Sequence, residues 1–215
     1  MQVDHLVWWC GDLAEGAARI GAVAELAPAY GGEHPGEGTA NWLLGLGPST
    51  YLEILGRDVK QPAAALDPTM ATLPGTGLYH WAVSGADLHD LKARTARAGL
   101  TGGELVSGGR TKPDGSWLGW TCFGLRDHGF GALIPFFIDW QGSQHPAATA
   151  PRGAQLAALR IESPEAAELQ AIYSALALPF TVKPGPVPRI VARLESGRGA
   201  IELETFSPLP GGYVI

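Results

Sequence analysis

VDHLVWWCGDL, residues 3–13, has a counterpart in LYHWAVSGADL, residues 78–88. Each stretch is typical of a buried strand that runs into a helix, because β-branched and aromatic residues give way to glycine and then to an Asp-Leu pair. In each, a histidine stands seven residues before the aspartate: His5 before Asp12, and His80 before Asp87. This shared spacing predicts an internal repeat.

The segments that follow the two stretches also keep one order. Each predicted unit has a strand, a helix, a glycine-rich loop and further strands, with the loops at residues 30–39 and 102–115. We describe this unit as β-α-β-β-β. It is placed at residues 1–57 and 76–142, where the two copies pair, and in a degenerate third copy at residues 155–206.

The composition excludes several classes of protein. The 215 residues include 46% apolar and only 17% charged residues, enough for a substantial core, and no apolar run is long enough to span a membrane. The net charge of −6 argues against a nucleic-acid partner. With two cysteines and no signal-peptide pattern, we expect a reduced, cytoplasmic protein.

Lone carboxylates stand among apolar residues in the last predicted strand of each of the first two units. They are Glu53 in TYLEILG and Asp139 in PFFIDW. Burying a carboxylate or an imidazolium without a partner is costly. Two histidines and two acids at matching places therefore suggest mutual compensation, which a divalent cation would supply well. The competing interpretation is that each histidine is a core residue bonded to a carbonyl group.

Several motifs together resemble the glyoxalase-like domain proteins of the vicinal oxygen chelate superfamily. They are DHLVWW, GGEHPGEGTANWLLGLG, YLEILG and PFFIDW. That superfamily includes glyoxalase I, extradiol dioxygenases, methylmalonyl-CoA epimerase and antibiotic-resistance proteins. The resemblance covers residues 1–145, and it reaches the third unit by pattern alone.

The resemblance implies an α+β fold in which paired units form a cup of curved, mixed strands. It also implies a divalent metal in the cup, such as zinc, nickel, manganese or iron, with His5, Glu53, His80 and Asp139 as its ligands. Asp139 departs from the glutamate common at its place and is one methylene shorter. The third unit has no histidine, so we expect it to be structural and either to pack beside the other two or to extend a homodimer interface.

A small-molecule pocket needs apolar walls with a few convergent polar groups. The residues expected to bind substrate are Trp9, His34, Asn41, Trp42, Arg110 and Trp120. Arg110 could hold a substrate carboxylate in a bidentate pair, or could be an exposed loop residue. His145 lies in the turn-rich segment SQHPAA and is expected at the surface.

Two functional hypotheses follow from these residues. The first is a metal-dependent lyase or isomerase acting on a small, oxygen-rich substrate, with Glu53 or Asp139 as the catalytic base. Dioxygenase activity fits less well, because it needs two histidines and one carboxylate, and a fourth ligand is present here. The alternative is a metal-free protein that binds or sequesters a small molecule, as antibiotic-resistance relatives do.

Overall fold

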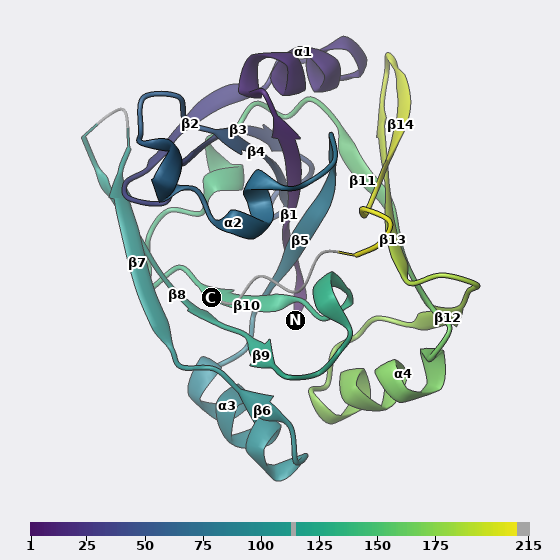
Figure 1. Cartoon of the computed structure of the whole chain (residues 1–215). Helices are drawn as coiled ribbons and strands as arrows, with labels where there is room; N and C mark the ends of the chain where they lie inside the picture. Colours follow the sequence, from purple (N-terminus) through teal and green to yellow (C-terminus); the bar gives the residue numbers. More distant parts are fainter. Residues whose placement is uncertain (113–114, 210–215) are drawn as a thin grey trace.

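The computed structural model describes residues 1–112 and 115–209 (Figure 1). The first part contains β1 (Gln2–Gly11), α1 (Leu13–Val23), β2 (Ala29–His34), β3 (Thr39–Gly45), β4 (Tyr51–Arg57) and α2 (Pro68–Ala71). The second contains β5 (Gly77–Ser84), α3 (Leu88–Arg97), β6 (Thr101–Gly102), β7 (Val106–Thr111), β8 (Trp117–Phe123), β9 (Leu125–Arg126) and β10 (Phe136–Asp139). The third contains β11 (Gln155–Ser163), α4 (Ala166–Ala175), β12 (Val182–Pro184), β13 (Arg189–Ser196) and β14 (Gly199–Glu204). Short 3₁₀ helices lie at Ala63–Ala65, Gly131–Leu133 and Pro146–Ala148.

One curved mixed sheet has the strand order β2-β3-β4-β1-β5-β10-β8-β7. Its centre is the antiparallel pair β1–β5, and each of these strands has a parallel neighbour, β4 beside β1 and β10 beside β5. The sheet curls until its edge strands β2 and β7 touch, and Arg110 on β7 donates a hydrogen bond to the carbonyl oxygen of Gly31 on β2. The prediction of an α+β fold with a curved, mixed-sheet cup is confirmed.

One prediction from the sequence is wrong at the edge strands β2 and β7. The segments that contain them, residues 30–39 and 102–115, were expected to be loops because they are rich in glycine. In β2 the glycines serve close packing, since a Cβ at Gly31 would collide with the side chain of Asn41, and one at Gly32 with Arg110. Glycine here permits a close approach across the cup and does not end the strand.

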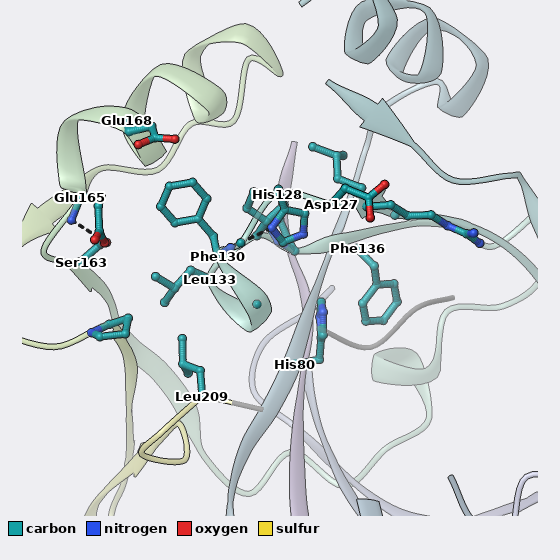
Figure 2. Close-up of a pocket in the computed structure, with 18 of the residues that line it drawn as sticks. His80, Asp127, His128, Phe130, Leu133, Phe136, Ser163, Glu165, Glu168 and Leu209 are labelled. Carbon is teal, nitrogen blue, oxygen red and sulfur yellow. Dashed lines mark hydrogen bonds between the residues drawn. The ribbon is translucent and has the colours of Figure 1, made fainter. Parts of the chain in front are cut away.

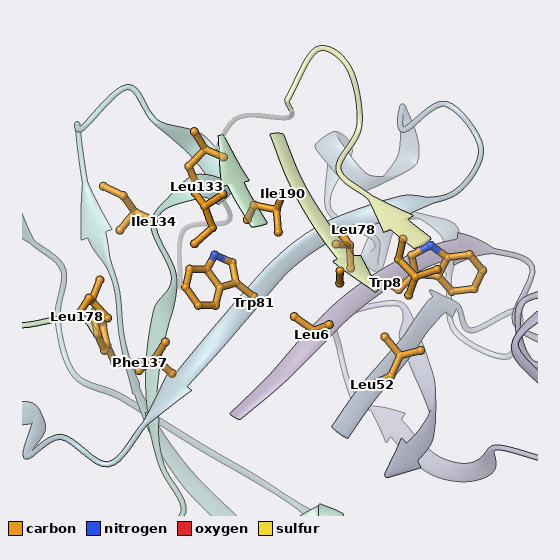
Figure 3. Close-up of a cluster of buried hydrophobic side chains, with 14 of the residues drawn as sticks. Leu6, Trp8, Leu52, Leu78, Trp81, Leu133, Ile134, Phe137, Leu178 and Ile190 are labelled. Carbon is orange, nitrogen blue, oxygen red and sulfur yellow. The ribbon is translucent and has the colours of Figure 1, made fainter. Parts of the chain in front are cut away.

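The two faces of the sheet are covered differently. Along β1 the side chains of Leu6 and Trp8 enter the main hydrophobic core, whereas His5 and Val7 line the cup. This alternation follows from the two-residue period of a strand. Figure 3 shows the main core, in which residues of β1, β4 and β5 meet residues of the third part, such as Ile190.

The third part of the chain forms a separate sheet, β12-β11-β13-β14, which packs beside the first two parts (Figure 1). The hydroxyl of Tyr173 on α4 donates to the carbonyl oxygen of Leu133, and Arg94 on α3 donates to the carbonyl oxygen of Leu176 at 3.0 Å. These bonds fix the third part against the second. No helix within residues 1–112 and 115–209 is long and apolar enough to cross a lipid bilayer.

Helices α1 and α3 begin as the sequence predicts. The Asp12 carboxylate accepts hydrogen bonds from the backbone N–H groups of Ala14 and Glu15 at 2.8 and 2.9 Å, and Asp87 accepts one from that of Asp90 at 2.9 Å. Each aspartate satisfies backbone donors that the first helical turn leaves without a partner. His5 and His80 lie on neighbouring strands of the same sheet because β1 and β5 pair with each other.

Candidate functional site

The cup encloses a cavity of about 460 Å³ that carries most of the polar residues discussed above. His5, Glu53, His34 and Asn41 lie on one side of it, on β1 to β4, and Arg110 and Trp120 come from β7 and β8. Aromatic side chains complete the walls, among them Tyr51, Phe136 and Trp140. This is the mixture of apolar wall and convergent polar groups that small-molecule sites have.

A buried pair, Asp4 and His5, forms the back of the site. Adjacent residues in a regular strand face opposite ways, but the β1–β5 register shifts between Val3 and His5, which marks a bulge at Asp4. The Asp4 carboxylate, wholly buried, accepts a hydrogen bond from Nδ1 of His5 at 2.8 Å. Since a carboxylate only accepts, the His5 proton lies on Nδ1, and its Nε2 is left for the cavity. Tyr51 stacks on this imidazole with 4.7 Å between ring centroids.

The second carboxylate oxygen of Asp4 contacts residues of the segment after β10. Nε2 of His145 lies 3.0 Å from Asp4 Oδ2, and Nε1 of Trp140 donates to it at 3.1 Å. Burial by itself would raise the pKa of Asp4, but the bonds from His145 and His5 outweigh it and hold this pKa well below its usual range. His145 was expected at the surface; its side chain is 22% exposed, and its ring is a partner of a buried carboxylate.

Glu53 stands between two histidines on the cavity wall. One carboxylate oxygen lies 3.8 Å from Nε2 of His5, and the other lies 3.6 Å from Nε2 of His34. Asn41 donates to Glu53 at 2.6 Å and also lies 3.2 Å from Nε2 of His34. Thr39 is 2.8 Å from the other ring nitrogen of His34. The carboxylate is thus held in place by an amide while it faces His5.

His80 lies apart from this group. Its Nδ1 is engaged with the backbone of Trp81, 3.0 Å from the nitrogen and 3.2 Å from the oxygen. Burial lowers the pKa of His80 to about 4, against a smaller opposite effect of the bond to Trp81, so the imidazole is neutral at pH 7. The ring of Phe136 contacts both imidazoles, with centroid distances of 5.3 Å to His80 and 5.4 Å to His5.

Asp139 is placed away from the other three predicted ligands. It is exposed, and its carboxylate accepts a hydrogen bond from the backbone N–H of Gln141 at 2.9 Å. In β10 the residues on the cup side are Phe136 and Ile138, followed by Trp140, so Asp139 faces outward. In the register of the repeat, Val7 pairs with Glu53, and the equivalent Ala82 pairs with Phe136. Phe136 therefore stands in the second unit where Glu53 stands in the first.

These positions do not fit the divalent-metal centre that the resemblance implies. Within residues 1–112 and 115–209, no group of three or more His, Cys, Asp or Glu side chains is placed to hold a metal ion. Glu53 and His5 approach each other, whereas Asp139 faces solvent and Phe136 occupies the remaining equivalent place.

The other predicted binding residues divide into two sets. His34, Asn41, Arg110 and Trp120 line the cavity. Trp9 shares the cup face of β1 with Val7 but is packed in a small cluster with Met70 and Phe206, and Trp42 packs against the main core. Neither Trp9 nor Trp42 is among the residues that line the cavity.

A second cavity, of about 810 Å³, lies between the second and third parts of the chain (Figure 2). His80 and Phe136 line both cavities and so form part of the wall between them. On the far side the second cavity is bounded by Ser163 and Glu165, near the start of α4.

Sequence reasoning missed Asp4, His145, Tyr51 and Phe136 as parts of the site. The pairing of Asp4 with His5 depends on a bulge, and that of His145 with Asp4 spans 141 positions of the chain. One signal in the sequence points to Asp4, because it is an acid next to a histidine in an otherwise apolar strand. A buried acid requires partners.

Comparisons with known proteins agree with this architecture. A crystal structure of a hypothetical protein from Staphylococcus aureus is similar over 99% of this chain and 86% of its own, with 14% identity and a TM-score of 0.65. A mutant of 4-hydroxymandelate synthase from Streptomyces coelicolor is similar over 94% of this chain and 62% of its own, with 13% identity and a TM-score of 0.53. These likenesses concern the fold alone.

Methylmalonyl-CoA epimerase from Streptomyces coelicolor, in complex with 2-nitronate-propionyl-CoA, matches 68% of this chain and 99% of its own at 16% identity and a TM-score of 0.47. No curated protein matches the sequence of this chain. The family model described as "Glyoxalase-like domain" matches residues 3–177. The chain belongs to the glyoxalase-like domain family, and with it to the vicinal oxygen chelate superfamily.

Proposed function

We propose that the cup is the active site of a lyase or isomerase that moves a proton on a small, oxygen-rich substrate, using the side chains of His5 and Glu53 without a metal. The observation that carries this proposal is the series Asp4–His5–Glu53 at the wall of the cavity, in which Asp4 and His5 are hydrogen-bonded at 2.8 Å and the Glu53 carboxylate lies 3.8 Å from Nε2 of His5. Membership of the glyoxalase-like family is consistent with such chemistry and does not specify the reaction.

Each residue of the series has a distinct role in this proposal. Glu53 is the base that takes a proton from a carbon next to a carbonyl group, and Asn41 holds one of its oxygens. Nε2 of His5 carries no proton, because the proton of the ring lies on Nδ1 and is donated to Asp4. Nε2 therefore takes the proton of a substrate hydroxyl group and returns it to the neighbouring oxygen, while Glu53 returns the proton that it took to the adjacent carbon, so that both side chains end in their starting states. Asp4 is a positioning residue, which fixes the tautomer and the orientation of the imidazole as buried acids do in other histidine sites.

The walls of the cup support proton transfer by limiting access of water. Tyr51 stacks on His5, and Trp140 and Phe136 lie against the same imidazole. The aromatic rings hold the histidine rigidly and reduce the local dielectric constant, which strengthens the interaction of a developing enolate with nearby donors.

Deuterium exchange tests the proposal whatever the product of the reaction is. The protein is incubated in D₂O with a panel of 2-oxo acids, 2-hydroxy carbonyl compounds and glutathione hemithioacetals, and exchange of the C–H proton is followed by NMR. The proposal expects accelerated exchange for at least one compound and loss of this acceleration in Glu53→Gln, which keeps the shape of the side chain. Equal rates for the wild type and Glu53→Gln would overturn it.

The alternative of a binding protein is favoured by one feature, the pair of tryptophans on the cavity wall. Trp120 and Trp140 lie edge to face with 6.0 Å between centroids, and they offer a surface for a flat apolar ligand. Saturable binding of a compound from the panel that undergoes no exchange would support a binding role over the enzymatic one.

A further inference from the structure

Arg110 is a buried cation at the side of the cup. Only 8% of the residue is exposed, and it lines the cavity that contains His5 and Glu53. Among the described residues no Asp or Glu forms an ion pair with it, and the contact that holds it is the hydrogen bond to the carbonyl oxygen of Gly31. Burying a charge without a counter-charge is costly, so such a group points to a ligand that supplies one.

The backbone opposite Arg110 is shaped to admit its guanidinium group. A Cβ at Gly32 would collide with that group, and the φ of Gly32, +144°, is one that side chains rarely adopt. One guanidinium N–H is used at Gly31, and a guanidinium has five. The planar fork of the remaining donors matches the two oxygens of a carboxylate, which a lysine ammonium group does not.

The charge balance of the cavity selects the kind of anion. Among the described residues that line it, Arg110 is the only Lys or Arg, whereas Glu37 and Glu53 are acidic. A phosphate dianion would bring two negative charges to one cation beside two carboxylates. A single carboxylate is neutralised by Arg110 alone, so the balance favours a carboxylate over a phosphate.

We infer that Arg110 binds the carboxylate of a small organic acid, and that the substrate of this cup is such an acid. The orientation of that acid, with its reacting carbon toward His5 and Glu53, rests on the function proposed above. The binding of the carboxylate does not. In this role Arg110 both recognises the substrate and links β7 to β2 over it.

Calorimetric titration with a matched pair of probes tests the inference. The probes are 3-phenylpropanoate and its neutral amide, 3-phenylpropanamide, which differ at the group that Arg110 would hold. We expect the wild type to bind the acid about tenfold or more tightly than the amide, because a charged hydrogen-bonded pair is lost with the amide. Binding of the acid that is absent, or no tighter than that of the amide, would overturn the inference.

Two variants separate recognition from a purely structural link. Arg110→Gln removes the charge and keeps an N–H donor, so it should reduce affinity for the acid to that for the amide and leave the amide unaffected. Arg110→Lys keeps the charge and should retain part of the preference. If Arg110 were only a link between strands, Arg110→Gln would weaken the binding of both probes equally. If circular dichroism shows that either variant fails to fold, the ratio of the wild type's affinities for the acid and the amide still tests the inference.

The outcome is independent of the proton-transfer proposal. Glu53→Gln is expected to keep the preference for the acid while it loses deuterium exchange. Exchange that fails for every compound, with the preference intact, would contradict the proposed function and leave the carboxylate site standing. Deuterium exchange without any preference for the acid would overturn the carboxylate site and leave the proposed function standing.

Discussion

Oδ1 of Asp4 lies 2.8 Å from Nδ1 of His5, although the two residues are neighbours in one strand. The bulge in β1 makes this contact possible, because it turns two consecutive side chains toward the same partners. With His145 and Trp140 on its other oxygen, Asp4 links the first strand of the sheet to the segment after the strand β10. The orientation of His5 is therefore determined by residues from both ends of the cup.

Replacement of Asp4 by Asn should reduce both stability and activity. The amide leaves two imidazoles and an indole N–H with one neutral acceptor in place of a carboxylate, at an estimated cost of about 1–3 kcal/mol in the free energy of unfolding. Urea denaturation measures this cost. The matched control is Asp139→Asn, an exposed acid of the same sheet, for which a change of less than about 0.5 kcal/mol is expected. Similar costs for both variants would contradict the role of Asp4.

His80 should make the protein less stable as the pH falls from 6.5 toward 4. Its pKa is lowered by burial from 6.5 to about 4, so in this window the unfolded chain takes up a proton that the folded chain does not. Stability attributable to His80 is thus present above pH 6.5 and is lost on acidification, by about 3 kcal/mol.

The comparison that isolates this effect uses His80→Asn, whose amide offers a donor and an acceptor near the Trp81 backbone. Between pH 6.5 and 4 the wild type should lose more unfolding free energy than His80→Asn. His89→Asn, on the exposed face of α3, should behave like the wild type. Parallel pH profiles for all three proteins would show that His80 is not the responsible group.

Phe136→Glu should create a metal site. Phe136 occupies the place in the second unit that Glu53 occupies in the first, and its ring contacts both His5 and His80. A carboxylate there would join two histidines and Glu53, a donor set suited to zinc, nickel or manganese. Titration calorimetry should show about tenfold or greater gain in metal affinity over the wild type and over the control Phe136→Leu. A wild type that binds one equivalent as tightly as Phe136→Glu would show that the existing residues suffice.

Gly32→Ala should open the contact between β2 and β7. The new methyl group would displace the Arg110 guanidinium and would also hold a φ of +144°, which strains a residue other than glycine by about 1–3 kcal/mol. Gly36→Ala is the control, because Gly36 also has a positive φ, +83°, but has open space around it. Thermal unfolding should show the larger loss for Gly32→Ala, together with loss of its preference for 3-phenylpropanoate. Equal losses of thermal stability in the two variants would mean that the collision with Arg110 does not contribute to the effect.

Much of the fold was predictable from the sequence, because the repeat is visible in the spacing of His5 and His80 from their helix caps. His5 and Glu53 were placed in the cup by the resemblance to the glyoxalase-like domain proteins, and both line its cavity. The edge strands were missed because glycine usually ends a strand, whereas Gly31 and Gly32 are there to admit other side chains.

The position of Asp139 could not be deduced in the same way. In PFFIDW both alternating sets of residues are largely apolar, so the pattern does not reveal which set faces the cup. The pairing of β10 with β5 settles the question by placing Phe136 opposite Ala82. Asp4 was missed for a related reason, because a single-residue bulge leaves no trace in hydrophobic periodicity.

The most direct test of the central claim is the rate of C–H deuterium exchange, for the best compound of the panel, in the presence and absence of EDTA. Proton transfer by His5 and Glu53 alone predicts the same rate with and without EDTA, and loss of the rate in Glu53→Gln under both conditions. A rate abolished by EDTA and restored by added zinc, nickel, manganese or iron would contradict the account and show that the cup works through a metal.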